Sequence, residues 1–127
     1  MNWLLSIHWA LIAAVWYFGN GVLHDIFVLL NHKGKYDREL LRLLMDGHVL
    51  ILSGAVVFVC YLMMLSKIQC GGLIGIIIGV GMLVYCAMIF PFLKSFGTII
   101  ISILLIIVSI KAIYSFPNIY DIMKNYK

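Results

Sequence analysis

The sequence predicts an all-α integral membrane protein, an up-down-up-down bundle of four helices with a long hairpin formed by the first two. Apolar residues make up 65% of the 127 residues and charged residues 11%, whereas soluble domains hold about 45–50% and about 25%. A chain this small cannot bury such an excess in one core, because small domains leave much of their surface in water. Four segments are also long and apolar enough to cross a bilayer.

The four predicted membrane spans lie at about residues 3–30, 44–65, 71–93 and 98–116, within one transmembrane domain covering residues 1–127. The third span contains no charged residue, and the fourth is interrupted only by Lys111. The stretches SKIQ and KSFG follow the second and third spans. Such short connections place neighbouring helices antiparallel.

The first two helices are predicted to extend beyond their spans and to meet at the turn HKGKY. Asp37 is the expected N-cap of the second helix, since its carboxylate can accept hydrogen bonds from free N–H groups of the first turn. The first helix is then expected to run from Trp3 to about Asn31, and the second to about Leu65. Each helix would be ~43 Å long at 1.5 Å per residue, against a hydrocarbon core of ~30 Å. We therefore expect the hairpin to project from the membrane or to tilt.

The basic residues predict the orientation. None precedes the first span, and four follow it in the first connection, namely Lys33, Lys35, Arg38 and Arg42. Positive charge favours the cytoplasmic side, so we expect this connection in the cytoplasm and both termini outside the cell (inner) membrane. Basic residues at span ends meet lipid headgroups, and nucleic-acid binding is not expected.

The stretch VLHDIFVLLNHKGKYDRELLRLLMDGH, residues 22–48, gathers three of the four His and four of the five acidic residues. Folding the hairpin about residues 34–36 brings His24 and Asp25 to the depth of Asp46 and His48, near the inner edge of the hydrocarbon. His48 shares its helix face with leucines, so we expect it to point into the bundle. The predicted pair is His24 with His48, and Asp25 is its expected orienting partner.

Other polar residues of the hairpin are expected to form a structural network made up of Asn20, Asp37, Arg42 and Asp46. Arg42 and Asp46 are four residues apart and can pair on one helix face. The motif GNG, residues 19–21, is expected to kink the first helix, to open space beside the next turn, where His24 lies, or to allow a close helix crossing.

Gly71, Gly75 and Gly79 repeat every four residues in the third span and therefore share one helix face. Small residues at this spacing let another backbone approach closely. We expect a helix-packing face whose partner is another helix of the chain, a second copy in a homodimer, or another membrane protein.

Three hypotheses for function follow from the polar layer that His24, Asp25, Asp46 and His48 are expected to form. All three remain open at this point. In the first, His24 and His48 bind haem axially, or hold a transition metal together with Asp25, in a small accessory subunit of a membrane complex. In the second, the chain is a dimeric proton- or ion-coupled small transporter, because His and Asp at membrane depth suit proton relay. In the third, the network only locks the hairpin, and the protein is purely structural. The sequence holds no recognisable catalytic motif, and we do not expect an enzyme.

Overall fold

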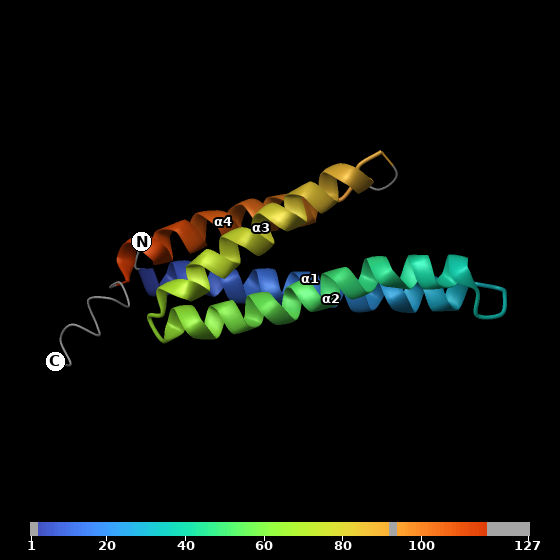
Figure 1. Cartoon of the computed structure of the whole chain (residues 1–127), viewed down its shortest axis with the longest axis horizontal. Helices are drawn as coiled ribbons and strands as arrows, with labels where there is room; N and C mark the ends of the chain where they lie inside the picture. The colour runs from blue at the N-terminus through green and yellow to red at the C-terminus, as the bar shows by residue number, and fades with distance from the viewer. Residues whose placement is uncertain (1–2, 92–93, 117–127) are drawn as a thin grey trace.

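The computed structural model describes residues 3–91 and 94–116, which form four α-helices that run alternately up and down (Figure 1). No strand occurs within these two ranges. The helices are α1 (Trp3–Asn31), α2 (Arg38–Leu65), α3 (Gln69–Ile89) and α4 (Phe96–Ser115). The predicted all-helical class and the order of the four helices are confirmed.

Each helix is long and apolar enough to cross a membrane. Only 22–33% of the residues in the most apolar window of each helix are buried inside the protein. Most apolar side chains therefore face outward, where a bilayer would cover them. The helices α1 and α2 have 29 and 28 residues, while α3 and α4 have 21 and 20. At 1.5 Å per residue the first hairpin is longer by about 12 Å, and Figure 1 shows its tip projecting past the second hairpin.

Local interactions set the helix ends. Asp37 caps α2 as predicted, because its carboxylate accepts a hydrogen bond of 2.8 Å from the backbone N–H of Leu40. In the turn between α2 and α3, Lys67 takes the left-handed backbone conformation with φ 58°, which is uncommon for a residue with a Cβ atom. The chain reverses direction there within three residues.

The later helices begin two residues earlier than the predicted spans 71–93 and 98–116. The helix α3 ends at Ile89, and its C-cap Phe90 still has helical backbone angles, φ −52° and ψ −38°. Pro91 follows, and it has no backbone N–H with which to continue the helical hydrogen bonds. Residues 92 and 93 of the predicted span lie outside the described ranges. In the first hairpin, α2 is continuous from Arg38, so the second span at 44–65 is only the apolar part of a longer helix.

The helices α1 and α2 cross closely through small residues. A Cβ atom on Gly21 would lie 2.6 Å from the carbonyl oxygen of Gly47, and one on Gly54 would lie 2.8 Å from that of Ala14. The small residues are spaced by seven on each helix, so the two contacts lie along one seam. Gly19, by contrast, has no atom within 4 Å of an added Cβ. Of the alternatives for GNG, the structure shows a close crossing through Gly21 in an unbroken helix.

The predicted glycine face of α3 is occupied within the chain. A Cβ atom on Gly71 would lie 2.8 Å from the carbonyl oxygen of Cys60 in α2. Gly75 packs against Ser109 of α4, and a Cβ on Gly79 would lie 2.6 Å from Cγ1 of Ile106. These glycines therefore bring α3 onto the neighbouring helices of the same chain.

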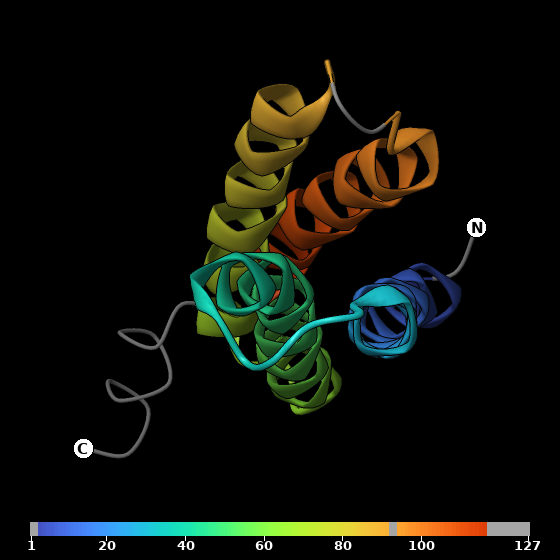
Figure 2. The same ribbon diagram turned by 90° about the vertical axis from the view of Figure 1, so that its right-hand side faces the viewer.

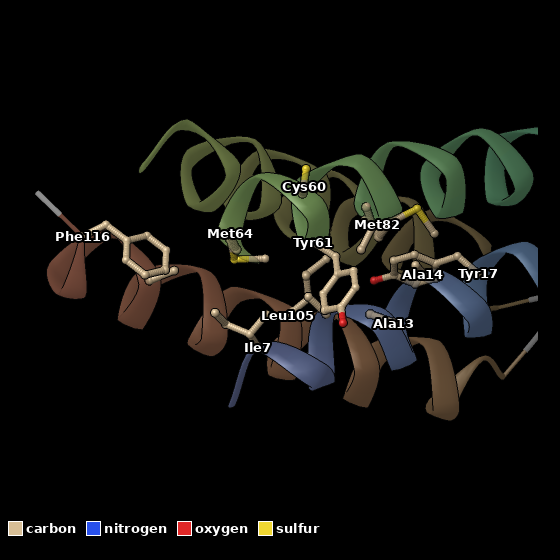
Figure 3. Close-up of a cluster of buried hydrophobic side chains, with 13 residues drawn as sticks. Ile7, Ala13, Ala14, Tyr17, Cys60, Tyr61, Met64, Met82, Leu105 and Phe116 are labelled. Atoms are coloured by element: carbon tan, nitrogen blue, oxygen red, sulfur yellow. The ribbon is translucent and has the colours of Figure 1, made fainter. Parts of the chain in front are cut away.

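The buried core lies in the half of the bundle that contains the turn between α2 and α3 (Figure 3). It includes Ala13 and Tyr17 of α1, Met64 of α2, Met82 of α3 and Leu105 of α4. Tyr17 is fully buried, and its hydroxyl lies 2.6 Å from Oγ of Ser102. Ser102 donates its own proton to the Thr98 carbonyl oxygen, so Tyr17 is the donor in the bond that joins α1 to α4.

At the opposite end, the two hairpins diverge. Figure 1 shows α3 and α4 moving away from α1 and α2 toward the connection between α3 and α4, and the end-on view in Figure 2 shows the same separation. The predicted polar layer, made up of His24, Asp25, Asp46 and His48, lies on the first hairpin at this diverging end.

Candidate functional site

A cavity of about 330 Å³ lies between the diverging hairpins, and all four helices line it. Its volume is at the lower end of the range for small-molecule sites, about 300–1,000 Å³. The wall combines ionisable, hydroxyl-bearing and apolar side chains, which are His24, Asp46, Leu50, Tyr85, Cys86, Ile89, Ser95 and Thr98. This largely apolar cavity, with ionisable and hydroxyl groups in its wall, is the strongest candidate site in the described part of the chain.

The carboxylate of Asp25 lies beside this cavity, in the crossing of α1 and α2. A Cβ atom on Gly47 would overlap it, so the carboxylate occupies the space that glycine leaves free. The Asp25 side chain is only 13% exposed. One of its oxygens, Oδ2, lies 3.0 Å from Nδ1 of His48, and the other, Oδ1, lies 3.6 Å from Nδ1 of His24. A single carboxylate thus stands between two imidazoles.

The geometry around His48 determines where its proton resides. Its Nδ1 atom lies 2.9 Å from the carbonyl oxygen of Leu44 and 3.0 Å from the Asp25 carboxylate. Both neighbours are acceptors when the carboxylate is ionised, so Nδ1 must carry the hydrogen that it donates. The other ring nitrogen, Nε2, is left to take or release a second proton. The His48 side chain is 65% exposed, on the outer side of the hairpin.

His24 is on the inner side of the same carboxylate. Its Nδ1 atom and Oδ1 of Asp25 are both buried, and within the described ranges neither has a hydrogen-bond partner. Their separation of 3.6 Å exceeds a hydrogen bond. A proton on Nδ1 and a shift of about 0.6 Å would give both atoms a partner. The side chain also lines the cavity, so a proton gained here changes the charge of the cavity wall.

The two histidines of the predicted pair both lie against Asp25, but His48 does not point into the bundle as expected. The expectation that His48 points into the bundle rested on its leucine-rich helix face, but in this helix those leucines face outward with it; Leu52 is 65% exposed. Gly47 faces α1 instead, because its missing side chain permits the close crossing. The two imidazoles therefore lie on either side of Asp25. Axial haem ligation would instead require them to oppose each other. Within residues 3–91 and 94–116, no group of three or more His, Cys, Asp or Glu side chains could hold a metal ion.

The four residues expected to form one structural network are placed separately. Asn20 donates to the carbonyl oxygen of Trp16 in its own helix, and Asp37 caps α2. Arg42 and Asp46 share a groove along α2. In the described ranges, however, no Lys, Arg or His nitrogen lies within 4.0 Å of the Asp46 carboxylate. Asp46 instead lines the cavity, together with Tyr85.

Several site residues were missed because they lie in apolar spans or, for Ser95, in the short connection before the fourth span. Tyr85, Ser95 and Thr98 reach the cavity from α3 and from the start of α4, and nothing in their local sequence distinguishes them from packing residues. His8 has a partner that spacing could not reveal, since its Nδ1 lies 3.3 Å from the hydroxyl of Tyr61. Each of these contacts joins helices that are distant in sequence.

Taken together, three side chains lie in a row, from His48 on the outer side of the hairpin, through Asp25, to His24 at the cavity. The first step, between His48 and Asp25, is 3.0 Å, and the second, between Asp25 and His24, is 3.6 Å. Comparison with protein-family models, with curated proteins and with solved structures finds no match to this chain. The inference of function therefore rests on the site itself.

Proposed function

We propose that the chain is a small multi-pass membrane protein of the transporter class, in which proton binding at His24, Asp25 and His48 is coupled to occupancy of the cavity between the hairpins. The observation that carries this proposal is the position of His24. Its Nδ1 atom faces the Asp25 carboxylate, while its side chain lines the cavity beside Asp46. Protonation of His24 and binding of a solute would then both alter the same cavity wall.

The membrane setting is part of the proposal. The four apolar helices support a multi-pass protein, and the basic residues after the first helix favour a cytoplasmic position for the connection between α1 and α2. Four helices enclose little of a transport pathway, so we propose that the active form is a homodimer in the cell (inner) membrane. The second copy would have to pack on a surface other than the glycine face of α3, which α2 and α4 already occupy.

Proteoliposomes test the coupling directly. The purified full-length chain is reconstituted with a pH-sensitive dye inside acidic vesicles, and small organic cations, carboxylates and sugars are added outside in turn. We expect one class to drive proton release. Asp25→Asn and His24→Asn should slow that release at least about tenfold, because each removes a link in the proton path.

Two matched controls accompany this experiment. Glu39→Gln removes an exposed acid from the hairpin, and His32→Asn removes a histidine near its turn; both should retain the wild-type rate. If no class of solute moves protons, or if Asp25→Asn releases them as fast as the wild type, the proposed coupling is wrong.

A purely structural role is the second candidate, and the packing of Asp25 over Gly47 favours it. In this account the carboxylate bridges His48 and His24 only to hold α1 against α2. The structural role predicts that Asp25→Asn lowers the stability of the hairpin while proton release is absent from the wild type as well. The same set of variants therefore separates the two candidates.

A further inference from the structure

One carboxyl group of the cavity wall has no ion-pair partner in the described part of the chain. Asp46 reaches the cavity from α2, and within the described residues it has no ion-pair partner at 4.0 Å or less. Arg42, one turn earlier, lies with Asp46 in the outer groove but makes no such pair with it. An ionised carboxylate at membrane depth is costly unless it is paired, so Asp46 has an unfilled requirement for a positive partner.

Tyr85 supplies the second element of a cation site. The side chains of Tyr85 and Asp46 belong to the same cavity wall. The face of an aromatic ring attracts a cation within about 6 Å of its centre, and the attraction is larger where water is excluded. Carboxylate and aromatic ring together are the groups that recognise substituted ammonium ions in proteins.

The remaining wall sets the size and polarity of the ligand. Leu50 and Ile89 offer apolar contact, while Ser95 and Thr98 of α4 offer hydroxyl groups. At about 330 Å³ the cavity suits a molecule of only a few carbon atoms around its charged group. A small organic cation with alkyl substituents matches both the polar groups and the apolar side chains of this wall.

We propose that this cavity binds a small organic cation, with its ammonium group between the Asp46 carboxylate and the Tyr85 ring. The proposal rests on the proposed function, for which it names the class of solute. The titratable groups of the described chain that line the cavity are His24 from α1, Asp46 from α2, and Tyr85 and Cys86 from α3; α4 contributes only hydroxyl groups. A proton on His24 would repel the bound cation, so the two compete for one cavity. This competition is what proton-for-cation exchange requires.

Equilibrium binding to the purified full-length chain in lipid nanodiscs tests the proposal at fixed pH. Choline serves as the probe, 3,3-dimethyl-1-butanol as its uncharged analogue of matched shape, and acetate as the anion. We expect choline to bind and the two other compounds not to bind. Asp46→Asn and Tyr85→Leu should each weaken choline binding at least about tenfold, because each removes one of the two attractive groups.

Matched variants keep the result specific. Glu39→Gln removes an acid from the outer groove of the same helix and should leave choline binding unchanged, while Tyr85→Phe keeps the ring and should retain most of it. Absence of choline binding at millimolar concentration overturns the proposal. Equal binding of the uncharged analogue, wild-type binding by Asp46→Asn, or binding of acetate in place of choline also overturns it.

This experiment fails independently of the transport experiment. Choline binding without solute-driven proton release would support the cation site and contradict the coupling. Proton release driven only by carboxylates or sugars, without choline binding, would support the coupling and remove the cation site.

Discussion

Gly54→Ala is expected to lower the free energy of unfolding by about 2 kcal/mol, through overpacking of the crossing between α1 and α2. The added Cβ atom would lie 2.6 Å from the backbone nitrogen of Phe18 and 2.8 Å from the carbonyl oxygen of Ala14. Backbone atoms of a helix cannot move aside separately, so the two helices must separate. This cost exceeds the ~0.5–1 kcal/mol by which alanine is otherwise favoured over glycine in a helix.

Gly19→Ala is the matched control. Gly19 lines the same apolar groove between α1 and α2 as Gly54, but it has no atom within 4 Å of an added Cβ. It should raise stability by up to ~1 kcal/mol. Reversible unfolding of both variants in mixed micelles measures the difference. Equal stabilities for the two variants would contradict the close seam between α1 and α2.

Gly47→Ala is expected to disable the proton path without replacing any ionisable residue. The new methyl group would occupy the place of the Asp25 carboxylate. Because that carboxylate is the end of a side chain, it can rotate away, and both of its contacts with His24 and His48 should be lost. We expect solute-driven proton release to fall at least about tenfold, as in Asp25→Asn.

The loss in Gly47→Ala should occur in a folded protein. The nearest backbone atom to the new Cβ is the Gly21 carbonyl oxygen at 3.0 Å, a looser contact than those at Gly54. We therefore expect a smaller loss of unfolding free energy than for Gly54→Ala. Gly81→Ala, at a position with open space around it, should raise stability slightly, as Gly19→Ala does, and should leave proton release unchanged. Wild-type release by Gly47→Ala would show that the carboxylate position is unimportant.

The helices could be predicted because composition, span length and turn chemistry act locally. The extent of α1, from Trp3 to Asn31, and the cap at Asp37 follow from residues that lie next to each other in the chain. The meeting of His24, Asp25 and His48 also follows, because a tight turn fixes which residues of an antiparallel hairpin lie at the same depth.

Which face of α2 meets α1 could not be read from its apolar residues. In a membrane a leucine-rich face is as stable against lipid as against protein, so it does not mark the inside. The informative signal was the small residues, with Gly47 and Gly54 seven apart on α2, and Ala14 and Gly21 seven apart on α1. Those pairs place His48 outside the hairpin and Asp46 toward α3.

The cavity itself depends on the placement of the second hairpin, which no local pattern encodes. Tyr85 and Asp46 line one cavity only because of how the second hairpin is placed against the first. In the sequence, Tyr85 lies between Val84 and Cys86 within an uncharged span, where an aromatic residue has many other roles.

The central claim is that one carboxylate joins two imidazoles on opposite sides of the hairpin. Nitrogen-15 spectra of histidine-labelled protein in lipid nanodiscs test it most directly, with wild type, Asp25→Asn and Asp46→Asn compared at one pH. We predict that Asp25→Asn changes the ring resonances of both His24 and His48, while Asp46→Asn changes those of His24 alone and His8 is unaffected by either. If Asp25→Asn changes only one of the two imidazoles, or neither, the shared carboxylate and the proton path built on it are contradicted.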